Sequence, residues 1–159
     1  MKIGRITISD RAAAGVYEDL SGPEIERTLQ SCFRAVFIAA TVPDEQEEIS
    51  SKLREFADLE GCDLIVTTGG TGIGARDVTP EATRAVLDRE LPGFGEIMRA
   101  QSFARVKTAI LSRAIAGVRG TALIVNLPGK PRAVTECLEL LGPAIREGLA
   151  HLRGEDPHA

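Results

Sequence analysis

The segment of residues 64–81 limits the possible folds of this chain more than any other part of the sequence. It opens with the apolar run Leu64-Ile65-Val66, followed by two threonines and a series of glycines. A short apolar run bounded by glycines is typical of a central strand in a parallel sheet. Thr79 and Pro80 are residue types that cap and open a helix. The segment therefore predicts a buried strand, a glycine-rich loop and a helix in succession.

Four glycines within six residues, Gly69, Gly70, Gly72 and Gly74, set the character of this loop. Glycine tolerates positive φ and has no side chain, so bare backbone N–H groups can approach a ligand. Such donors favour phosphates, and Asp77 beside them can hold a cation that attracts phosphate. The common motifs G-x-x-x-x-G-K-[ST] and G-x-G-x-x-G are both missing. The alternative interpretation is a tight turn without a ligand, in which Asp77 bonds only to local backbone.

Strand and helix patterns alternate along the whole chain, which predicts an α/β layer fold with a largely parallel sheet. Strands are predicted at about residues 3–8, 35–42, 63–68, 114–118 and 122–126. A last helix is predicted from about residue 134 to 152, and Gly142-Pro143 would kink or split it. The length suits one domain, residues 1–153, and residues 154–159 are expected to form a flexible tail.

Three helix starts are predicted from local pattern. Ser21 with Glu24 has the spacing of a capping box, and so does Asp44 with Glu47. Ser21 and Asp44 are therefore predicted N-caps. The helix that follows the glycine-rich loop is predicted to cover residues 79–89.

Polar or small residues follow each predicted parallel strand, where ligands bind in sheets of this kind. They are Ser9-Asp10-Arg11 after the first strand, Asp44 after the second, the glycine-rich loop after the third, and Asn126-Leu127-Pro128-Gly129 after the last. One cleft could collect all four segments. Alternatively, Asn126 and Gly129 could only shape a turn.

Composition excludes several classes of function. The net charge of -4 and the pI near 5.3 argue against general nucleic-acid binding. No apolar run has membrane-spanning length, and the N-terminus enters a strand without a signal-peptide core. Three widely spaced cysteines are expected to be reduced packing residues, which favours a cytoplasmic protein. The two histidines, His151 and His158, lie near the C-terminus and argue against Ser-His-Asp or Cys-His catalysis.

Several segments, in order along the chain, together resemble the molybdenum cofactor biosynthesis family that includes bacterial Mog proteins and the N-terminal domain of gephyrin. The longest runs from Thr67-Thr68-Gly69-Gly70-Thr71-Gly72 to Arg76-Asp77-Val78-Thr79-Pro80-Glu81. The others are Ile8-Ser9-Asp10-Arg11, Ser21-Gly22-Pro23, Val42-Pro43-Asp44-Glu45, Leu111-Ser112-Arg113 and Asn126-Leu127-Pro128-Gly129.

The resemblance implies a three-layer α/β sandwich and a molybdopterin adenylyltransferase. Such an enzyme uses ATP and Mg²⁺ to join AMP to molybdopterin, and releases pyrophosphate. Family members are homotrimers, and a molybdate-inserting enzyme uses their product.

The resemblance also implies the residues of the site. Asp44 and Asp77 would be the catalytic pair and would hold Mg²⁺. The backbone of residues 69–72, with Thr71, would hold nucleotide phosphate. The remaining substrate and nucleotide ligands would be Ser9, Asp10, Thr68, Gly69, Gly70, Gly72, Thr79, Ser112, Arg113, Asn126, Pro128 and Gly129.

Two rival functions remain open from the sequence. The first is a non-catalytic molybdopterin-binding paralogue that acts as a carrier or scaffold. The second is a dinucleotide-dependent oxidoreductase, whose glycine fingerprint should follow the first strand and open a helix directly. Here the glycines follow the third strand, and the predicted helix begins several residues later.

Overall fold

The computed structural model describes residues 1–156 and 158, and its centre is a six-stranded sheet in the order β2-β1-β3-β6-β5-β4. The strands β2, β1, β3 and β6 are parallel, whereas β5 is antiparallel to β6 and β4 is antiparallel to β5. The bounds are β1 Lys2–Ile8, β2 Val36–Val42, β3 Leu64–Thr68, β4 Arg89–Glu90, β5 Ala116–Arg119 and β6 Ala122–Leu127. The predicted, mostly parallel α/β sheet is confirmed.

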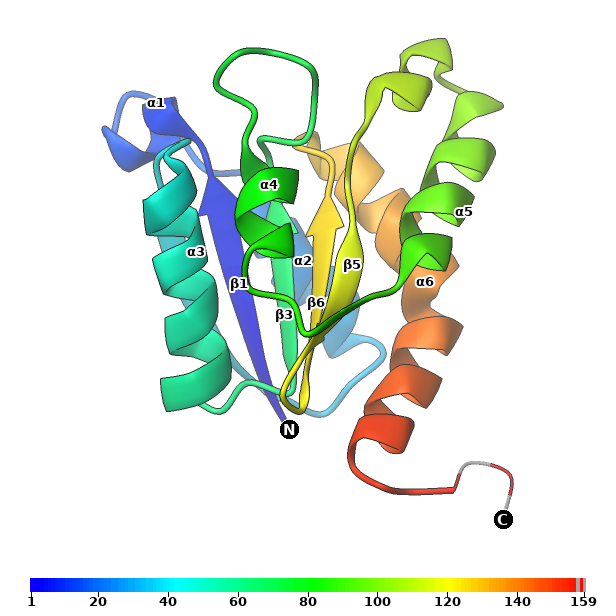
Figure 1. The fold of residues 1–159 in the computed structure, drawn as a ribbon. Coiled ribbons are helices and arrows are strands. Elements are labelled where there is room, and N and C mark those ends of the chain that lie inside the picture. The colour runs from blue at the N-terminus through cyan, green and yellow to red at the C-terminus, as the bar shows by residue number, and fades with distance from the viewer. Residues whose placement is uncertain (157, 159) are drawn as a thin grey trace.

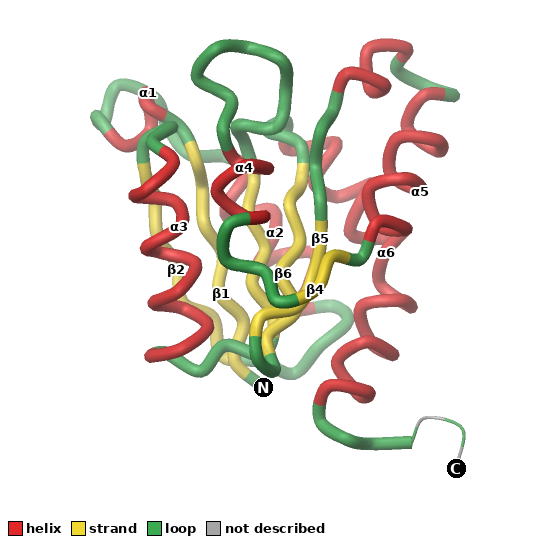
Figure 2. Tube along the Cα trace, viewed as in Figure 1, coloured by secondary structure: helices red, strands yellow, loops and turns green. Residues whose placement is uncertain are grey.

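Helices cover both faces of the sheet and complete a three-layer sandwich (Figures 1 and 2). One face carries α2 (Ser21–Gln30), α5 (Pro92–Phe103) and α6 (Pro131–Leu152). The other face carries α3 (Gln46–Arg54), its π-helical continuation η1 (Glu55–Leu59) and α4 (Thr79–Arg84). The short helices α1 (Asp10–Ala13) and η2 (Lys107–Leu111), the latter of the 3₁₀ type, lie at the end of the sheet where the parallel strands finish.

The strand β3 shows why this sequence folds into three layers. All five of its residues are buried. Successive side chains of a strand point to opposite faces. Leu64 and Val66 accordingly join the core under α2 and α6, whereas Ile65 joins the core under α3 and α4. A continuous apolar run is therefore needed here, because both faces of the strand are covered by helices.

Two predicted helices differ from the structure. The helix α4 ends at Arg84 rather than near residue 89, because the backbone at Arg89–Glu90 pairs with β5 and extends the sheet. The helix α6 continues unbroken through Pro143. Proline removes one N–H donor and frees the carbonyl of Glu139, four residues earlier. Both residues are exposed, so that carbonyl faces water.

Within the described part of the chain, no helix combines the length and the apolar character that crossing a bilayer requires.

Candidate functional site

The candidate site lies where the parallel strands end. The loop that joins β3 to α4, residues 69–78, rises beyond the sheet next to α1 (Figure 1). We call it the glycine-rich loop. Its neighbours are the segment after β1, the segment after β2 and the segment after β6, as the strand-end pattern predicts.

The first two glycines fix the path of this loop. Gly69 and Gly70 have φ angles of 100° and 67°, which other residues rarely adopt. A Cβ on Gly69 would collide with the carbonyl of Ile8, and one on Gly70 would collide with the hydroxyl of Thr79. The loop is therefore packed tightly against the end of β1.

The structure corrects the predicted role of Thr79. The N-cap position of α4 is Val78, and no side chain caps this helix. Instead, the buried Thr79 hydroxyl donates a 2.9 Å hydrogen bond to the carbonyl of Gly69, and its N–H donates to the carbonyl of Gly70. Thr79 thus fastens the end of the loop to its beginning.

The loop leaves backbone donors without a partner, as a phosphate site requires. The N–H of Gly69 bonds to the carbonyl of Leu127, but those of Gly70, Thr71 and Gly72 bond to nothing within residues 1–156 and 158. Adjacent N–H groups of this kind form a concave anion site. The structure therefore provides three free donors at the predicted phosphate-binding position.

Asp44 is not a helix cap, contrary to the sequence prediction. The helix α3 begins two residues later, and its N-cap position, Glu45, makes no side-chain cap bond. Asp44 Oδ2 instead accepts from the N–H of Asp10 at 2.9 Å, and Asp10 Oδ1 accepts from the N–H of Asp44 at 3.0 Å. This reciprocal pair joins the ends of β1 and β2 beside the glycine-rich loop.

The two carboxylates of this pair differ in electrostatic environment. Burial raises the pKa of Asp44, and the nearby negative charges of Asp10 and Asp77 raise it further. A hydrogen bond from the Arg76 guanidinium lowers the pKa of Asp10, and the Asp44 N–H lowers it further. The Asp44 carboxyl is therefore harder to ionise, and a cation beside it would stabilise the ionised form.

Arg76 crosses from the glycine-rich loop to the opposite wall of the site. Its Nε and Nη2 atoms each lie 3.0 Å from the Asp10 carboxylate, and Nη2 also lies 2.8 Å from Glu45 Oε1. The Arg76 side chain is nevertheless exposed to solvent. Arg76 joins the glycine-rich loop to Asp10 and Glu45, which follow β1 and β2.

Asp77 lies within the loop itself. Its Oδ2 accepts a 2.9 Å hydrogen bond from the N–H of Gly74. A Cβ on Gly72 or Gly74 would stand 2.9 Å from this oxygen, and one on Gly70 would stand 3.0 Å from Asp44 Oδ1. The glycines thus leave room for both carboxylates against one stretch of backbone.

Asp44 and Asp77 suit a hard divalent cation. Neither forms an ion pair with any side chain that the structure describes, although Asp10 and Glu45 beside them do. Mg²⁺ prefers oxygen ligands, and one or two carboxylates with substrate phosphates normally hold it. The donor set and its uncompensated charge fit the predicted Mg²⁺.

Arg113 also holds the glycine-rich loop. Its Nε donates to the carbonyl of Gly72 at 2.8 Å, and its Nη2 donates to the carbonyl of Asp77 at 2.7 Å. Nη1 pairs with Glu81 of α4 and holds the pKa of that carboxyl below its ordinary value. The Arg113 N–H also donates to the carbonyl of Thr71. Arg113 is thus occupied in bonds to the loop and α4.

A cavity of about 160 Å³ opens beside the loop. Several of its lining residues were predicted site residues, namely Ser9, Thr68, Gly69 and Gly129. Thr68 and Gly129 also shape it, because the Thr68 hydroxyl donates to the carbonyl of Pro128 and the Ser21 hydroxyl donates to that of Gly129. Ser21 is therefore not a helix cap. Asp19 accepts from the Gly22 N–H in that place.

The structure places other predicted residues away from this cavity. Ser112 and Arg113 line a separate cavity of about 350 Å³, together with Arg84 and Arg99. Asn126 is fully buried, and its amide donates to the hydroxyls of Thr67 and Thr83, each at 3.0 Å. Three of the four strand-end segments, those after β1, β3 and β6, therefore line the smaller cavity, whereas Asp44 after β2 does not line it and Asn126 belongs to the framework below the loop.

Sequence reasoning missed Tyr17 and Asp19, which also line the smaller cavity. Asp19 accepts from the Thr7 hydroxyl at 2.6 Å and from the Arg5 guanidinium at 3.3 Å. Aspartate is as good an N-cap residue as serine. The position of Asp19, two residues before Ser21, was therefore the signal in the sequence that could have pointed to it.

The fold and the site define an α/β protein whose parallel strands end beside a loop with unbonded backbone N–H groups and two carboxylates, Asp44 and Asp77, that form no ion pair among the described residues. Residues 4–147 match the family described as "Probable molybdopterin binding domain". The chain belongs to this molybdenum cofactor biosynthesis family, as the sequence motifs predict.

Individual relatives agree with this assignment. The chain is 49% identical to the molybdopterin adenylyltransferase of Haemophilus influenzae over 97% of its length and 78% of that protein. It is 51% identical to the Escherichia coli K12 molybdopterin adenylyltransferase over 87% of its length and 72% of that protein. The crystal structure of the molybdopterin biosynthesis enzyme MoaB from Thermus thermophilus matches with a TM-score of 0.89 and 43% identity, covering 97% of each chain.

Proposed function

We propose that this protein is a molybdopterin adenylyltransferase, a nucleotidyltransferase that transfers AMP from ATP to the terminal phosphate of molybdopterin and releases pyrophosphate. The observation that carries this proposal is the joint position of Asp44, Asp77 and the free N–H groups of the glycine-rich loop. The activity named for the similar bacterial proteins supports it.

Asp44 and Asp77 would hold Mg²⁺, which would neutralise the triphosphate and the leaving pyrophosphate. Asp10 positions Asp44 through the reciprocal backbone bonds described above. Thr79 and Arg113 position the loop that carries Asp77. Both substrates are anions, so the reaction needs a cation between them, and these acidic groups would hold that cation.

The N–H groups of Gly70, Thr71 and Gly72 would bind nucleotide phosphate and keep it in line with the attacking group. A phosphate nucleophile is already ionised near neutral pH, so the chain needs no general base. Positioning and electrostatic stabilisation supply most of the catalysis in reactions of this kind. The absence of histidine from residues 1–150 is consistent with such a mechanism.

Arg76 would exchange partners when the nucleotide binds. Its side chain is 57% exposed, and it bonds to two carboxylates at the edge of the site. Exposed ion pairs contribute little to stability, so phosphate oxygens can replace them at low cost. The guanidinium would then form bidentate bonds to the triphosphate.

The remaining predicted residues divide into two groups. Ser9, Thr68, Gly69 and Gly129, with Pro128 behind them, would form the wall of the substrate cavity. Ser112, Arg113 and Asn126 would act as positioning residues under and beside the loop. We further propose a cytoplasmic homotrimer that hands its product to a molybdate-inserting enzyme.

The deciding experiment is incubation with molybdopterin, Mg²⁺ and ATP labelled at the α-phosphate. We expect the label to move to molybdopterin with an equal amount of pyrophosphate. Binding of molybdopterin without label transfer or pyrophosphate release would instead identify a carrier or scaffold. Replacement of ATP by ATP with a non-hydrolysable α–β bridge is the matched control, because it can bind but cannot react.

A further inference from the structure

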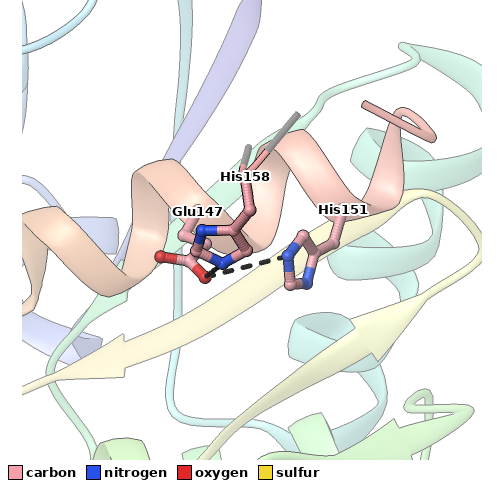
Figure 3. A group of neighbouring side chains, drawn as sticks. All are labelled: Glu147, His151 and His158. Atoms are coloured by element: carbon pink, nitrogen blue, oxygen red, sulfur yellow. Dashed lines mark hydrogen bonds and ion pairs between the residues drawn. The ribbon is translucent and has the colours of Figure 1, made fainter. Parts of the chain in front are cut away.

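A second group of potential metal ligands lies at the far end of α6, outside the site described above. Glu147, His151 and His158 each offer one ligand atom, and these three atoms lie within 4.8 Å of one another. Figure 3 shows both imidazoles turned toward the Glu147 carboxylate. Its Oε1 lies 3.2 Å from His158 Nε2 and 3.8 Å from His151 Nε2. Both histidines of the chain thus converge on one carboxylate.

Local sequence builds this arrangement. Glu147 and His151 are four residues apart on α6 and therefore share a face of the helix. The chain then turns at Gly154, whose φ is 72°. The N–H of Gly154 donates to the carbonyl of His151, and that of Glu155 donates to the carbonyl of Ala150. This pair of bonds is a Schellman motif, which reverses the chain and directs His158 back toward the helix.

The separations suit a single bound ion. Zn²⁺ bonds to nitrogen and carboxylate oxygen at about 2.0–2.2 Å, so ligand atoms of a tetrahedral site stand roughly 3.3–3.5 Å apart. The two separations from Glu147 Oε1, 3.2 and 3.8 Å, bracket this range. The nearest arginine along the chain, Arg146, donates to the carbonyl of Cys32 at 2.9 Å, and Arg153 pairs with Glu155 at 2.8 Å, so both leave Glu147 to the histidines.

We propose that Glu147, His151 and His158 form a site for a divalent transition metal of the Zn²⁺ type, with water completing its coordination. All three side chains are at least half exposed, so the ion reaches them directly from solvent. Two imidazoles select Zn²⁺, Ni²⁺ or Cu²⁺ over Mg²⁺, which prefers oxygen ligands. The bound ion ties the segment after α6 to the helix. This site is independent of the proposed adenylyltransferase activity.

The test is calorimetric titration of the untagged full-length protein with ZnCl₂. We expect one equivalent to bind, and we expect His151→Ala and His158→Ala each to weaken binding by about tenfold or more, since each removes a ligand. Glu139→Gln is the matched control, because it removes an exposed carboxylate of α6 outside the cluster. Binding that survives both histidine substitutions, or no binding by the parent, would overturn the proposal.

A second variant tests the geometry without touching a ligand. Gly154→Ala strains the left-handed turn that returns His158 to the helix. We expect a several-fold weaker Zn²⁺ affinity, with unchanged adenylylation in Mg²⁺. Equal affinity of this variant and the parent would show that the turn does not organise the site. Circular dichroism checks that each variant is folded.

Discussion

The two arginines that hold the glycine-rich loop differ in their partners. Arg113 donates to main-chain carbonyls of the loop, at Gly72 and Asp77, and pairs with Glu81 of the adjoining helix. Arg76 bonds only to carboxylates of other segments, those of Asp10 and Glu45. One arginine therefore maintains the shape of the loop, and the other connects the loop to the opposite wall.

This difference distinguishes a framework residue, Arg113, from a residue whose partners a ligand can replace, Arg76. Backbone carbonyls remain in place whether or not a ligand is bound, so the bonds of Arg113 are needed in every state. The carboxylate partners of Arg76 are exposed, and their loss costs little. A polyanionic ligand offers Arg76 equivalent oxygens but offers Arg113 nothing that it lacks. Substitutions at these two arginines, and at Asp44 and Asp77 beside them, can test this difference.

Asp77→Asn should have the largest effect. It keeps the shape of the side chain and an oxygen that accepts from the Gly74 N–H, but removes the charge that would hold Mg²⁺. We expect adenylylation to fall by about 10²–10³-fold or more, with molybdopterin binding and melting temperature nearly unchanged. Asp58→Asn, which affects a carboxylate paired with Arg119 at a distance from the loop, is the control. Equal turnover at saturating Mg²⁺ would remove Asp77 from the metal site.

Arg113→Met should lower the stability of the protein more than the other substitutions proposed here. It leaves the carbonyls of Gly72 and Asp77 without their donor and Glu81 without its cation. We expect a loss of about 2 kcal/mol in the free energy of unfolding, measured by urea denaturation. Arg113→Lys should recover only part of this loss, because one ammonium cannot reach all three partners. Full stability of the Met variant would contradict a framework role.

The same variant should also show a defined pH dependence. Arg113 lowers the pKa of Glu81 in the folded protein, so their interaction stabilises the fold above the pKa of Glu81 in the unfolded chain. This contribution disappears as pH falls through the lower, folded pKa. The stability difference between parent and Arg113→Met should therefore shrink on acidification toward pH 3. A constant difference would mean that the carbonyl bonds alone account for it.

Arg76→Gln should give the opposite balance of effects. We expect its melting temperature to change little, because the lost ion pairs are exposed. Its kcat/KM for ATP should fall about tenfold, the magnitude of one hydrogen bond to a charged group. Arg105→Gln, which removes an exposed arginine paired with Glu136, provides the control. A large loss of stability without a change in kinetics would assign Arg76 to the framework beside Arg113.

The sequence predicted the parts of the site that depend on local pattern. The strand β3, its glycine-rich loop and the following helix are encoded within residues 64–84, and all three are confirmed. The core faces follow because a doubly covered strand must be apolar throughout. The position of Asp77 beside the glycines is likewise a matter of sequence adjacency.

The contacts that sequence could not predict join residues far apart in the chain. An Asp-x-x-Glu pattern suits a helix cap, and only Asp10, 34 positions away, turns Asp44 into a reciprocal partner. In the same way, the Ser21 hydroxyl bonds to the carbonyl of Gly129, 108 positions away. Arg76 became recognisable only when its partners on two other segments were known. Local propensity does not carry such information.

The smallest expected effect concerns the stability contributed by Asp44. Its pKa is raised in the folded protein by burial and by neighbouring carboxylates. The folded state therefore keeps a proton on Asp44 more readily than the unfolded state, and ionisation lowers stability as pH rises through this range. Asp44→Asn removes that charge but keeps an oxygen that accepts from the Asp10 N–H.

We therefore expect Asp44→Asn to be more stable than the parent at pH 7 by about 0.5 kcal/mol, a small gain because the group is partly solvated. The gain should vanish near pH 3, where the parent carboxyl is protonated in both states. Melting temperatures of the two proteins across this pH range measure the effect, and Asp44→Ala, which also loses the bond to Asp10, should be less stable than Asp44→Asn throughout. Asp44→Asn could instead prove less stable than the parent at pH 7. The charged Asp44–Asp10 pair would then support the fold, as Arg113 does, and Asp44 would not be a free charge available to a cation.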